Sequence, residues 1–272
     1  MSNILIPILT LSGLGIIFGV GLAIAAKKFC VVTDPRLQKL FEKLPGANCG
    51  ACGMPGCMGF AEALIKGACT VEKCVVSEED KRKEIAQILG VEIKVRLEKV
   101  ALLHCHGGSK RAKDKYIYTG IKDCIAANQV MGGPKACLYG CIGYGTCGQA
   151  CPFGAIIMNQ EDLPVVNEDT CTACGACVAI CPKQLFSLVL TEKVYAVRCK
   201  SLDIGKVVMD VCSVGCIACR KCEKACPTGA IKVINNLAVI DYNICDNRGE
   251  CFKVCPTNCI AKKIDKAWTN KK

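Results

Sequence analysis

Cysteine is the residue type with which this sequence could do the most chemistry. The chain has 272 residues, of which 26 are cysteine, and it is far longer than a disulfide-stabilised mini-domain. So many thiols leave three chemistries open: disulfides, single metal ions and iron–sulfur clusters. The spacing of the cysteines and the compartment of the chain decide among them.

Two segments contain a complete C-x2-C-x2-C-x3-C-P motif, the pattern of bacterial ferredoxins that bind two clusters. The first motif consists of Cys171, Cys174, Cys177 and Cys181, and the second of Cys216, Cys219, Cys222 and Cys226. In such a motif the fourth cysteine binds the other cluster of the pair. A full motif followed by proline, present twice, indicates [4Fe–4S] clusters.

The second half of the chain is an internal duplication. Five cysteines recur 75 residues later, namely Cys124, Cys137, Cys141, Cys147 and Cys151 as Cys199, Cys212, Cys216, Cys222 and Cys226. Three more recur 74 residues later, namely Cys171, Cys177 and Cys181 as Cys245, Cys251 and Cys255. Two of the four motifs are incomplete, because Tyr144 stands where the second copy has Cys219 and Arg248 where the first has Cys174.

The cross-ligation rule assigns these cysteines to four sites. Site two takes Cys151, Cys171, Cys174 and Cys177, and site three takes Cys216, Cys219, Cys222 and Cys255. Site one takes Cys141, Cys147 and Cys181, with Cys137 as the expected fourth ligand. Site four has only Cys226, Cys245 and Cys251, because arginine cannot bind iron. This last site holds a [3Fe–4S] cluster, recruits Cys259 or Asp246, or is empty.

A further cysteine group, here called the N-terminal site, precedes the duplication. Its spacing is C-x2-C-x4-C-x16-C, formed by Cys49, Cys52, Cys57 and Cys74. The glycines between the thiols allow the backbone to wrap closely around a cluster. Zinc is the alternative, but a zinc site usually has two CxxC pairs and this group has one. We therefore expect four [4Fe–4S] clusters in the chain, with site four as an unsettled fifth.

Seven cysteines have no ligand role in this assignment: Cys30, Cys69, Cys105, Cys124, Cys199, Cys212 and Cys259. We interpret them as small buried apolar side chains. The only two histidines, His104 and His106, flank Cys105. With no further ligand nearby, we interpret them as part of a loop or strand rather than a metal site.

The first element that positions these residues is a membrane anchor at 1–28. Residues 4–26 are uncharged and mostly apolar, and as a helix they span about 34 Å, enough for a bilayer core. Lys27 and Lys28 follow the apolar run, whereas a secretory signal carries its positive charge before it. This pattern predicts a single span with the body in the bacterial cytoplasm. Cytoplasmic thiols are kept reduced, which argues against disulfides.

The remaining elements predict a multidomain fold. A helix begins at Asp34 and Pro35, with an apolar stripe at Leu37, Leu40, Phe41 and Leu44, and a charged helix begins at Ser77 and ends near Gly90. We expect a transmembrane helix, a small α-helical 4Fe-4S domain, and duplicated α+β bacterial-ferredoxin-like domains. The predicted bounds are 1–28, 29–76, a linker and connecting segment at 77–123, ferredoxin-like repeats at 124–196 and 197–261, and a basic tail at 262–272.

Charge and composition exclude several functions. The net charge of +11 alone would suggest nucleic acid, but bound clusters, each about −2, would offset most of it. No basic–aromatic interleaving and no zinc-finger spacing supports nucleic-acid binding. No GxGxxG lies between a strand and a helix, so we expect no direct NAD binding. The apolar run contains no acid or base that could form an ion path.

The order of these features resembles the B subunit of the Rnf ion-translocating ferredoxin:NAD oxidoreductase. Residues 44–57 and 132–147 carry the resemblance most specifically, and the latter segment is similar to a longer form with cysteine at Cys137 and Cys141. The resemblance supports Cys137 as a ligand, while Arg248 departs from the usual cysteine. It implies an electron-transfer subunit that accepts electrons from soluble reduced ferredoxin and passes them to partner subunits in the membrane. Those partners would bind flavin and NAD, and this chain would bind neither.

Two other functions remain to be weighed. A membrane-tethered scaffold with structural zinc would explain the CxxC pairs, and metal analysis separates it from an electron carrier. A self-contained enzyme that uses its clusters on a small substrate is the other possibility, but the sequence contains no group of residues that could act as nucleophile and base. We therefore expect no independent catalytic site.

Overall fold

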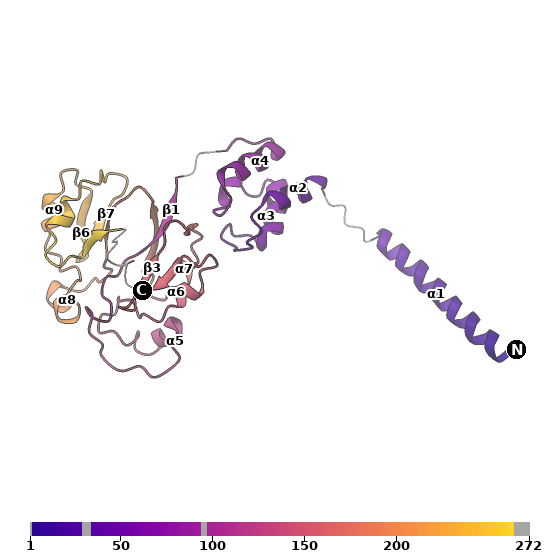
Figure 1. Ribbon diagram of the computed structural model, residues 1–272, viewed down its shortest axis with the longest axis horizontal. Coiled ribbons are helices and arrows are strands. Elements are labelled where there is room, and N and C mark those ends of the chain that lie inside the picture. The colour runs from indigo at the N-terminus through magenta and orange to yellow at the C-terminus, as the bar shows by residue number, and fades with distance from the viewer. Residues whose placement is uncertain (1, 29–33, 94–96, 264–272) are drawn as a thin grey trace.

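The computed structural model describes residues 2–28, 34–93 and 97–263 (Figure 1). The helices in these ranges are α1 (Ser2–Lys28), α2 (Pro35–Lys43), α3 (Gly56–Ile65), α4 (Glu79–Leu89), α5 (Cys124–Gln129), α6 (Thr146–Gln149), α7 (Ala176–Ile180), α8 (Gly205–Val211), α9 (Lys221–Ala225) and α10 (Glu250–Lys253), with a 3-10 turn at Val71–Lys73. The strands are β1 (Lys99–Leu103), β2 (Ile156–Met158), β3 (Pro164–Val166), β4 (Phe186–Leu190), β5 (Tyr195–Val197), β6 (Ile231–Ile234), β7 (Leu237–Ile240) and β8 (Ile260–Lys262).

The helix α1 is apolar along its length and stands apart from the rest of the chain in Figure 1. Its window 11–28 is long and apolar enough to cross a membrane, and none of that window is buried. Side chains such as Leu11 and Leu22 are more than two-thirds exposed. A helix with this composition needs an apolar environment that the described part of the chain does not provide.

The helices α2, α3 and α4 form a small domain around Phe60. The Asp34 carboxylate caps α2 by accepting from the Arg36 N–H at 2.8 Å, and Pro35 follows in the first turn, as predicted. Leu40, Phe60 and Ile85 are almost completely buried. The charged helix begins one residue later than its predicted cap implies, at Glu79, and the Ser77 hydroxyl makes no cap bond.

Four two-stranded antiparallel sheets divide the rest of the described chain into two units. In unit 1 (99–190), β1 pairs with β4 and β2 with β3; in unit 2 (195–262), β5 pairs with β8 and β6 with β7. In each unit the first and last strands pair with each other. The two strands between them form a hairpin that separates the two cysteine motifs. This is the α+β ferredoxin-like arrangement expected from the duplication.

The unit boundaries differ from the predicted ones. The segment 77–123, predicted as a linker, contains α4 and β1, and β1 pairs with β4 from Lys99↔Leu190 to Leu103↔Phe186. Unit 1 therefore begins at Lys99 rather than Cys124. Strand β5, which the prediction places at the end of the first repeat, pairs with β8 and belongs to unit 2. The predicted basic tail lies almost wholly outside the described residues, as does Cys30.

Candidate iron–sulfur sites

The four motif loops share one backbone conformation. The residue before the second motif position has positive φ in each loop: Gly143 (93°), Ala173 (56°), Ala218 (54°) and Asn247 (62°). The residue after it does too: Gly145 (76°), Gly175 (81°), Arg220 (59°) and Gly249 (79°). Alternation of this kind turns backbone N–H groups toward one enclosed space and favours an anionic group there. Tyr144 and Arg248 thus stand in loops with the same pattern of φ angles as those of Cys174 and Cys219.

Site three has the thiols that cross-ligation predicts. One cavity in unit 2 is lined by Cys216, Cys219, Cys222 and Cys255. Cys255 comes from the far motif and reaches this cavity because α9 and α10 lie against each other. Cys219 is the exposed member of the group, whereas Cys216 and Cys222 are buried.

Site two lies in unit 1 beside β1. Burial raises the pKa of Cys177 to about 12, and the nearby thiols of Cys171 and Cys174 add to this. The Cys171 sulfur accepts a hydrogen bond from the Ala101 N–H at 3.5 Å. Cys151 packs in the same apolar cluster. Strand β1, absent from the predicted repeat, therefore contributes directly to this site.

Site one brings a different thiol from the predicted one beside its three motif cysteines. Its cavity is lined by Cys141, Cys147 and Cys181, and the fourth cysteine is Cys124 rather than Cys137. The Thr146 hydroxyl holds Cys124 there: it accepts from the Cys124 N–H at 2.8 Å and donates to the Asp123 carboxylate at 2.8 Å. Spacing alone favours Cys137, which is only four residues from Cys141.

The missing motif cysteine of site one is replaced by an aromatic pair. Tyr144 stacks on Tyr118, with ring centroids 5.8 Å apart. Cys124 thus supplies the thiol that the motif lacks. A search restricted to the motif spacing could not find it, although the substitution at Tyr144 indicates that a distant cysteine is needed.

Site four has three thiols. Cys251 lies near Cys245 and Cys226. The Arg248 side chain is 63% exposed and pairs with the Asp246 carboxylate at 2.6 Å, so this carboxylate is already engaged. Cys259 lines site three instead. Of the predicted alternatives, a three-cysteine site is the one this geometry favours.

The N-terminal site is organised by the loop before α3. Asn48 adopts a positive φ of 47°, and its side-chain oxygen accepts from the Cys57 N–H at 2.7 Å. Cys74 lies near Cys52 and Cys57, and burial raises its pKa. Cys69 is buried and directs its thiol toward the Phe60 carbonyl at 4.0 Å, as expected of a packing residue.

The arrangement of the thiol groups fits iron–sulfur clusters. The cysteines surround spaces, and backbone N–H groups point at the sulfurs of Cys171 in site two and Cys181 in site one. This arrangement fits the wider donor set and the hydrogen bonding of an iron–sulfur cluster.

The histidines have structural roles. His104 extends β1, with its N–H bonded to the Leu185 carbonyl at 2.7 Å and its ring bonded to Val197 and Ser187. Burial lowers the pKa of His104. His106 lies 3.3 Å from the Arg111 guanidinium.

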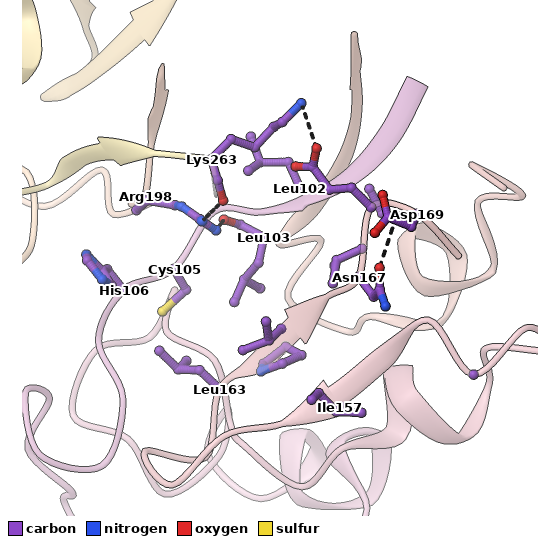
Figure 2. Close-up of a pocket in the computed structure, with 16 residues that line it drawn as sticks. Leu102, Leu103, Cys105, His106, Ile157, Leu163, Asn167, Asp169, Arg198 and Lys263 are labelled. Carbon is purple, nitrogen blue, oxygen red and sulfur yellow. Dashed lines mark hydrogen bonds and ion pairs between the residues drawn. The ribbon is translucent and has the colours of Figure 1, made fainter. Parts of the chain in front are cut away.

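A cavity of about 460 Å³ lies against β1 and β3 (Figure 2). Arg198 crosses one side of it and donates to the carbonyls of Leu103 at 2.9 Å and Lys263 at 3.1 Å. Lys263 pairs with Glu168 at 3.5 Å. Cys105 is the single cysteine in the lining, so this cavity is not itself a four-thiol site.

Comparisons with known proteins support iron–sulfur clusters in several of these segments. A family model for a putative Fe-S cluster matches residues 44–76, and two models for a 4Fe-4S dicluster domain match residues 140–185 and 170–230. The B subunit of the Na(+)-translocating ferredoxin:NAD(+) oxidoreductase complex of Acetobacterium woodii is 43% identical over 97% of this chain and 80% of its own. The B subunit of the ion-translocating oxidoreductase complex of Methanosarcina acetivorans is 42% identical over 96% of this chain and 99% of its own.

The chain belongs to the family of B subunits of ion-translocating oxidoreductase complexes. A third member, from the proton-translocating ferredoxin:NAD(+) oxidoreductase complex of Clostridium ljungdahlii, is 39% identical over 96% of this chain and 93% of its own. As a member of this family, the chain is an iron–sulfur electron-transfer component of a multi-subunit oxidoreductase complex. Its apolar α1 fits association with a membrane.

Proposed function

We propose that this chain accepts electrons from reduced ferredoxin at site three and relays them to partner subunits of an NAD-reducing, ion-translocating complex. When bound, each cluster supplies reversible one-electron transfer. The exposure of Cys219 carries the choice of site three, because the other ligand cysteines in the described ranges are less exposed. An electron donor needs close approach to one cluster.

The surface around Cys219 is basic. Arg220, Lys221 and Lys224 are exposed there, and acidic Glu223 is partly covered. Ferredoxins are acidic, so opposite charge would steer their approach and speed the encounter. The basic net charge of the whole chain points the same way.

Arg220 also adopts a strained conformation. Its φ is 59°, at a position where the three other motif loops have Gly145, Gly175 and Gly249. A left-handed conformation costs a residue with a Cβ roughly 1–2 kcal/mol. The presence of an arginine where the other loops have glycine supports a role for its charge. Its position beside Cys219 favours docking as that role.

The proposed topology is a single α1 span with the cluster domains in the cytoplasm. Lys27 and Lys28 end α1 on the side of the body, as the positive-inside pattern requires. The sequence has no dinucleotide fingerprint, so we assign NAD and flavin binding to other subunits. The names of two relatives include ferredoxin and NAD(+) as the reactants of their complexes, which supports the same overall reaction for the complex proposed here.

Charge reversal tests the docking site. The full chain with Arg220→Glu and Lys221→Glu is purified without oxygen, and its reduction by reduced ferredoxin is followed by stopped-flow absorbance. We expect the second-order rate constant to fall by at least about tenfold at low ionic strength, and less at high salt. The matched control is Lys39→Glu with Lys66→Glu, two exposed lysines of the α2–α4 domain that change the net charge equally.

The outcomes distinguish the possibilities. A rate that falls only in the Arg220 and Lys221 variant supports entry at site three. A rate that falls only in the control moves entry to the N-terminal site, and equal small effects contradict specific docking. Zinc in place of iron and sulfide in the purified chain would replace electron transfer by the scaffold role.

A further inference from the structure

Four cysteines outside the motif sites lie together between the two units. One cavity is lined by Cys105, Cys137, Cys199 and Cys212. Cys105 and Cys137 belong to unit 1, and Cys199 and Cys212 belong to unit 2. The sequence pattern gives three of them no ligand role and places Cys137 in site one.

Each unit contributes the same two positions. Cys105 follows β1, where the His104 N–H bonds the Leu185 carbonyl at 2.7 Å; Cys199 follows β5, where the Arg198 N–H bonds the Cys259 carbonyl at 2.8 Å. Strand pairing thus makes Cys199 the counterpart of Cys105, not of Cys124 as the 75-residue offset suggests. Cys137 and Cys212 each stand four residues before the first motif cysteine of their unit.

Backbone N–H groups point at all four sulfurs. The Cys105 sulfur accepts from the Cys141 N–H at 3.4 Å, and the Cys199 sulfur accepts from Ser201 at 3.4 Å and from Cys216. Tyr139 donates to Cys137, and Val214 and Gly215 donate to Cys212. N–H bonds of this kind stabilise sulfur that carries negative charge, as cluster-bound thiolates do.

Basic residues and a glycine also line this cavity, and the charged ends of the basic residues bond the backbone carbonyls of Leu103, Lys263 and Gln184. Arg198 and Lys200 line it. At Gly107 a side chain would be crowded, because an added Cβ would lie 3.0 Å from the Cys212 sulfur. The surroundings therefore suit a buried anionic group rather than four neutral packing thiols.

We propose that Cys105, Cys137, Cys199 and Cys212 bind an additional [4Fe–4S] cluster that bridges unit 1 and unit 2, and we call this the bridging site. The four thiols lose their protons when they bind iron. The site is adjacent to site one through Cys105 and Cys141, and to site three through Cys199 and Cys216. It deepens the proposed relay but does not depend on ferredoxin being the donor.

The bridging site gives the two units one route for electrons. Electron transfer between two redox centres slows as the distance between them grows, so a cluster between site three in unit 2 and site one in unit 1 would shorten each step. Cys141 and Cys216 are the first motif cysteines of their units, and each donates its N–H to a bridging-site sulfur. The bridging site is therefore placed where the relay needs it.

Iron counting tests the proposal. The full chain with Cys105→Ala, and separately with Cys212→Ala, is purified without oxygen, and its iron, sulfide and cluster-containing mass are measured by chemical assay and native mass spectrometry. We expect each variant to lose about four iron and four sulfide per chain. The control Cys69→Ala, which removes a buried thiol in another domain, should lose none.

The double variant guards against simple misfolding. If Cys105 and Cys212 bind one cluster, Cys105→Ala with Cys212→Ala loses about four iron, no more than either single variant. A loss of about eight would assign them to different sites and overturn the proposal, as would unchanged iron in the single variants. Ferredoxin-driven reduction of site three should persist in all of these variants, so failure of the bridging site and failure of ferredoxin docking are separable.

Discussion

At the scale of single residues, Arg248 is the residue on which we expect the state of site four to depend. Its loop already has the backbone of a complete motif, with positive φ at Asn247 and Gly249 on either side. We predict that Arg248→Cys adds one thiolate in ligand position and converts a three-cysteine site to a [4Fe–4S] site. EPR of the reduced chain should gain one [4Fe–4S] signal, and a [3Fe–4S] signal in the oxidised chain should disappear.

Arg248→Ala is the matched control for this prediction, because it removes the ion pair with Asp246 without adding a thiol. It should leave the spectra unchanged. If Arg248→Ala produces the same new signal as Arg248→Cys, the arginine blocks the site rather than replacing a ligand.

Cys259 is a second residue with a specific prediction. It is almost completely buried, and hydrogen bonding with the sulfurs of Cys199 and Cys216 raises its pKa and lowers theirs, which favours a Cys259 thiol whose single S–H is shared between the two sulfurs. A hydrogen bond to cluster sulfur stabilises the reduced state. We predict that Cys259→Ala lowers the potential of site three on the order of tens of millivolts, since one hydrogen bond contributes about 1 kcal/mol.

Redox titration followed by EPR measures this shift. Cys259→Ser keeps a donor at the same position and should restore most of the potential. A potential that is the same in Cys259→Ala as in the unmodified chain would make Cys259 a packing residue only.

The residue scale also separates what the sequence could predict from what it could not. The structure brings together the four thiols that cross-ligation assigned to site three, because their spacing is local and repeated. The position of Cys124 could not be inferred, because its hydrogen-bond network with Asp123 and Thr146 joins segments 22 to 23 residues apart. The correspondence between Cys105 and Cys199 in the two units could not be recognised from the sequence, because the 75-residue offset matches Cys199 with Cys124 instead.

At the scale of elements, the cluster loops combine strain and function. Arg220 caps the start of α9 with φ 59°, where glycine would have no steric cost. We predict that Arg220→Gly raises the free energy of unfolding of the chain by about 1 kcal/mol and slows reduction by ferredoxin. Chemical denaturation and stopped-flow measurements on the same variant test both effects.

Gly175→Ala is the reverse experiment at the same loop position of the complete motif in unit 1, where φ is 81°. It should destabilise the chain and leave ferredoxin reduction unchanged. If Arg220→Gly lowers stability, the arginine makes stabilising contacts that outweigh its strained backbone.

Strand β1 is an element that sequence patterning did not identify. The inner hairpin strands β3 and β7 occupy corresponding places in the two units. Residues 99–103 fall in the predicted linker, because their short, mostly apolar run lies before the first duplicated cysteine. This strand is buried because it pairs with β4, which is distant in sequence. The pattern of apolar residues in a short segment does not indicate which distant strand it pairs with.

At the scale of the whole molecule, the clusters would serve as much of the core of units 1 and 2. The buried apolar side chains of the two units include motif cysteines. Few of them are large, such as Phe186, Ile231 and Ile260. We predict that anaerobic chelation of iron abolishes cooperative thermal unfolding of both units, because ligand binding and folding are coupled. Limited proteolysis should then cut within 99–262, and reconstitution with iron and sulfide should restore protection.

A chelated chain that keeps its near-UV circular dichroism and its protease resistance would show that protein packing alone holds the units. The α2–α4 domain offers an internal comparison, because Leu40, Phe60 and Ile85 give it an apolar core of its own. We expect it to lose less structure than the units.

The anchor gives a further whole-molecule prediction. Deletion of residues 1–28 should move the chain from the membrane fraction to the soluble fraction, since α1 supplies the apolar surface. Iron per chain should stay unchanged, because no site uses these residues. A truncated chain that remains with membranes in the absence of its partners would place membrane contacts on the body.

The long separation between β1 and β4 has a consequence for synthesis. Leu103 pairs with Phe186, 83 residues later, so unit 1 cannot close until this second strand has left the ribosome. At bacterial elongation rates this interval is on the order of ten seconds. During that time the thiols of sites one and two emerge one after another on an open chain. Cluster-assembly proteins therefore have time to insert iron before β1 pairs with β4. The bridging site can fill only after both units are made.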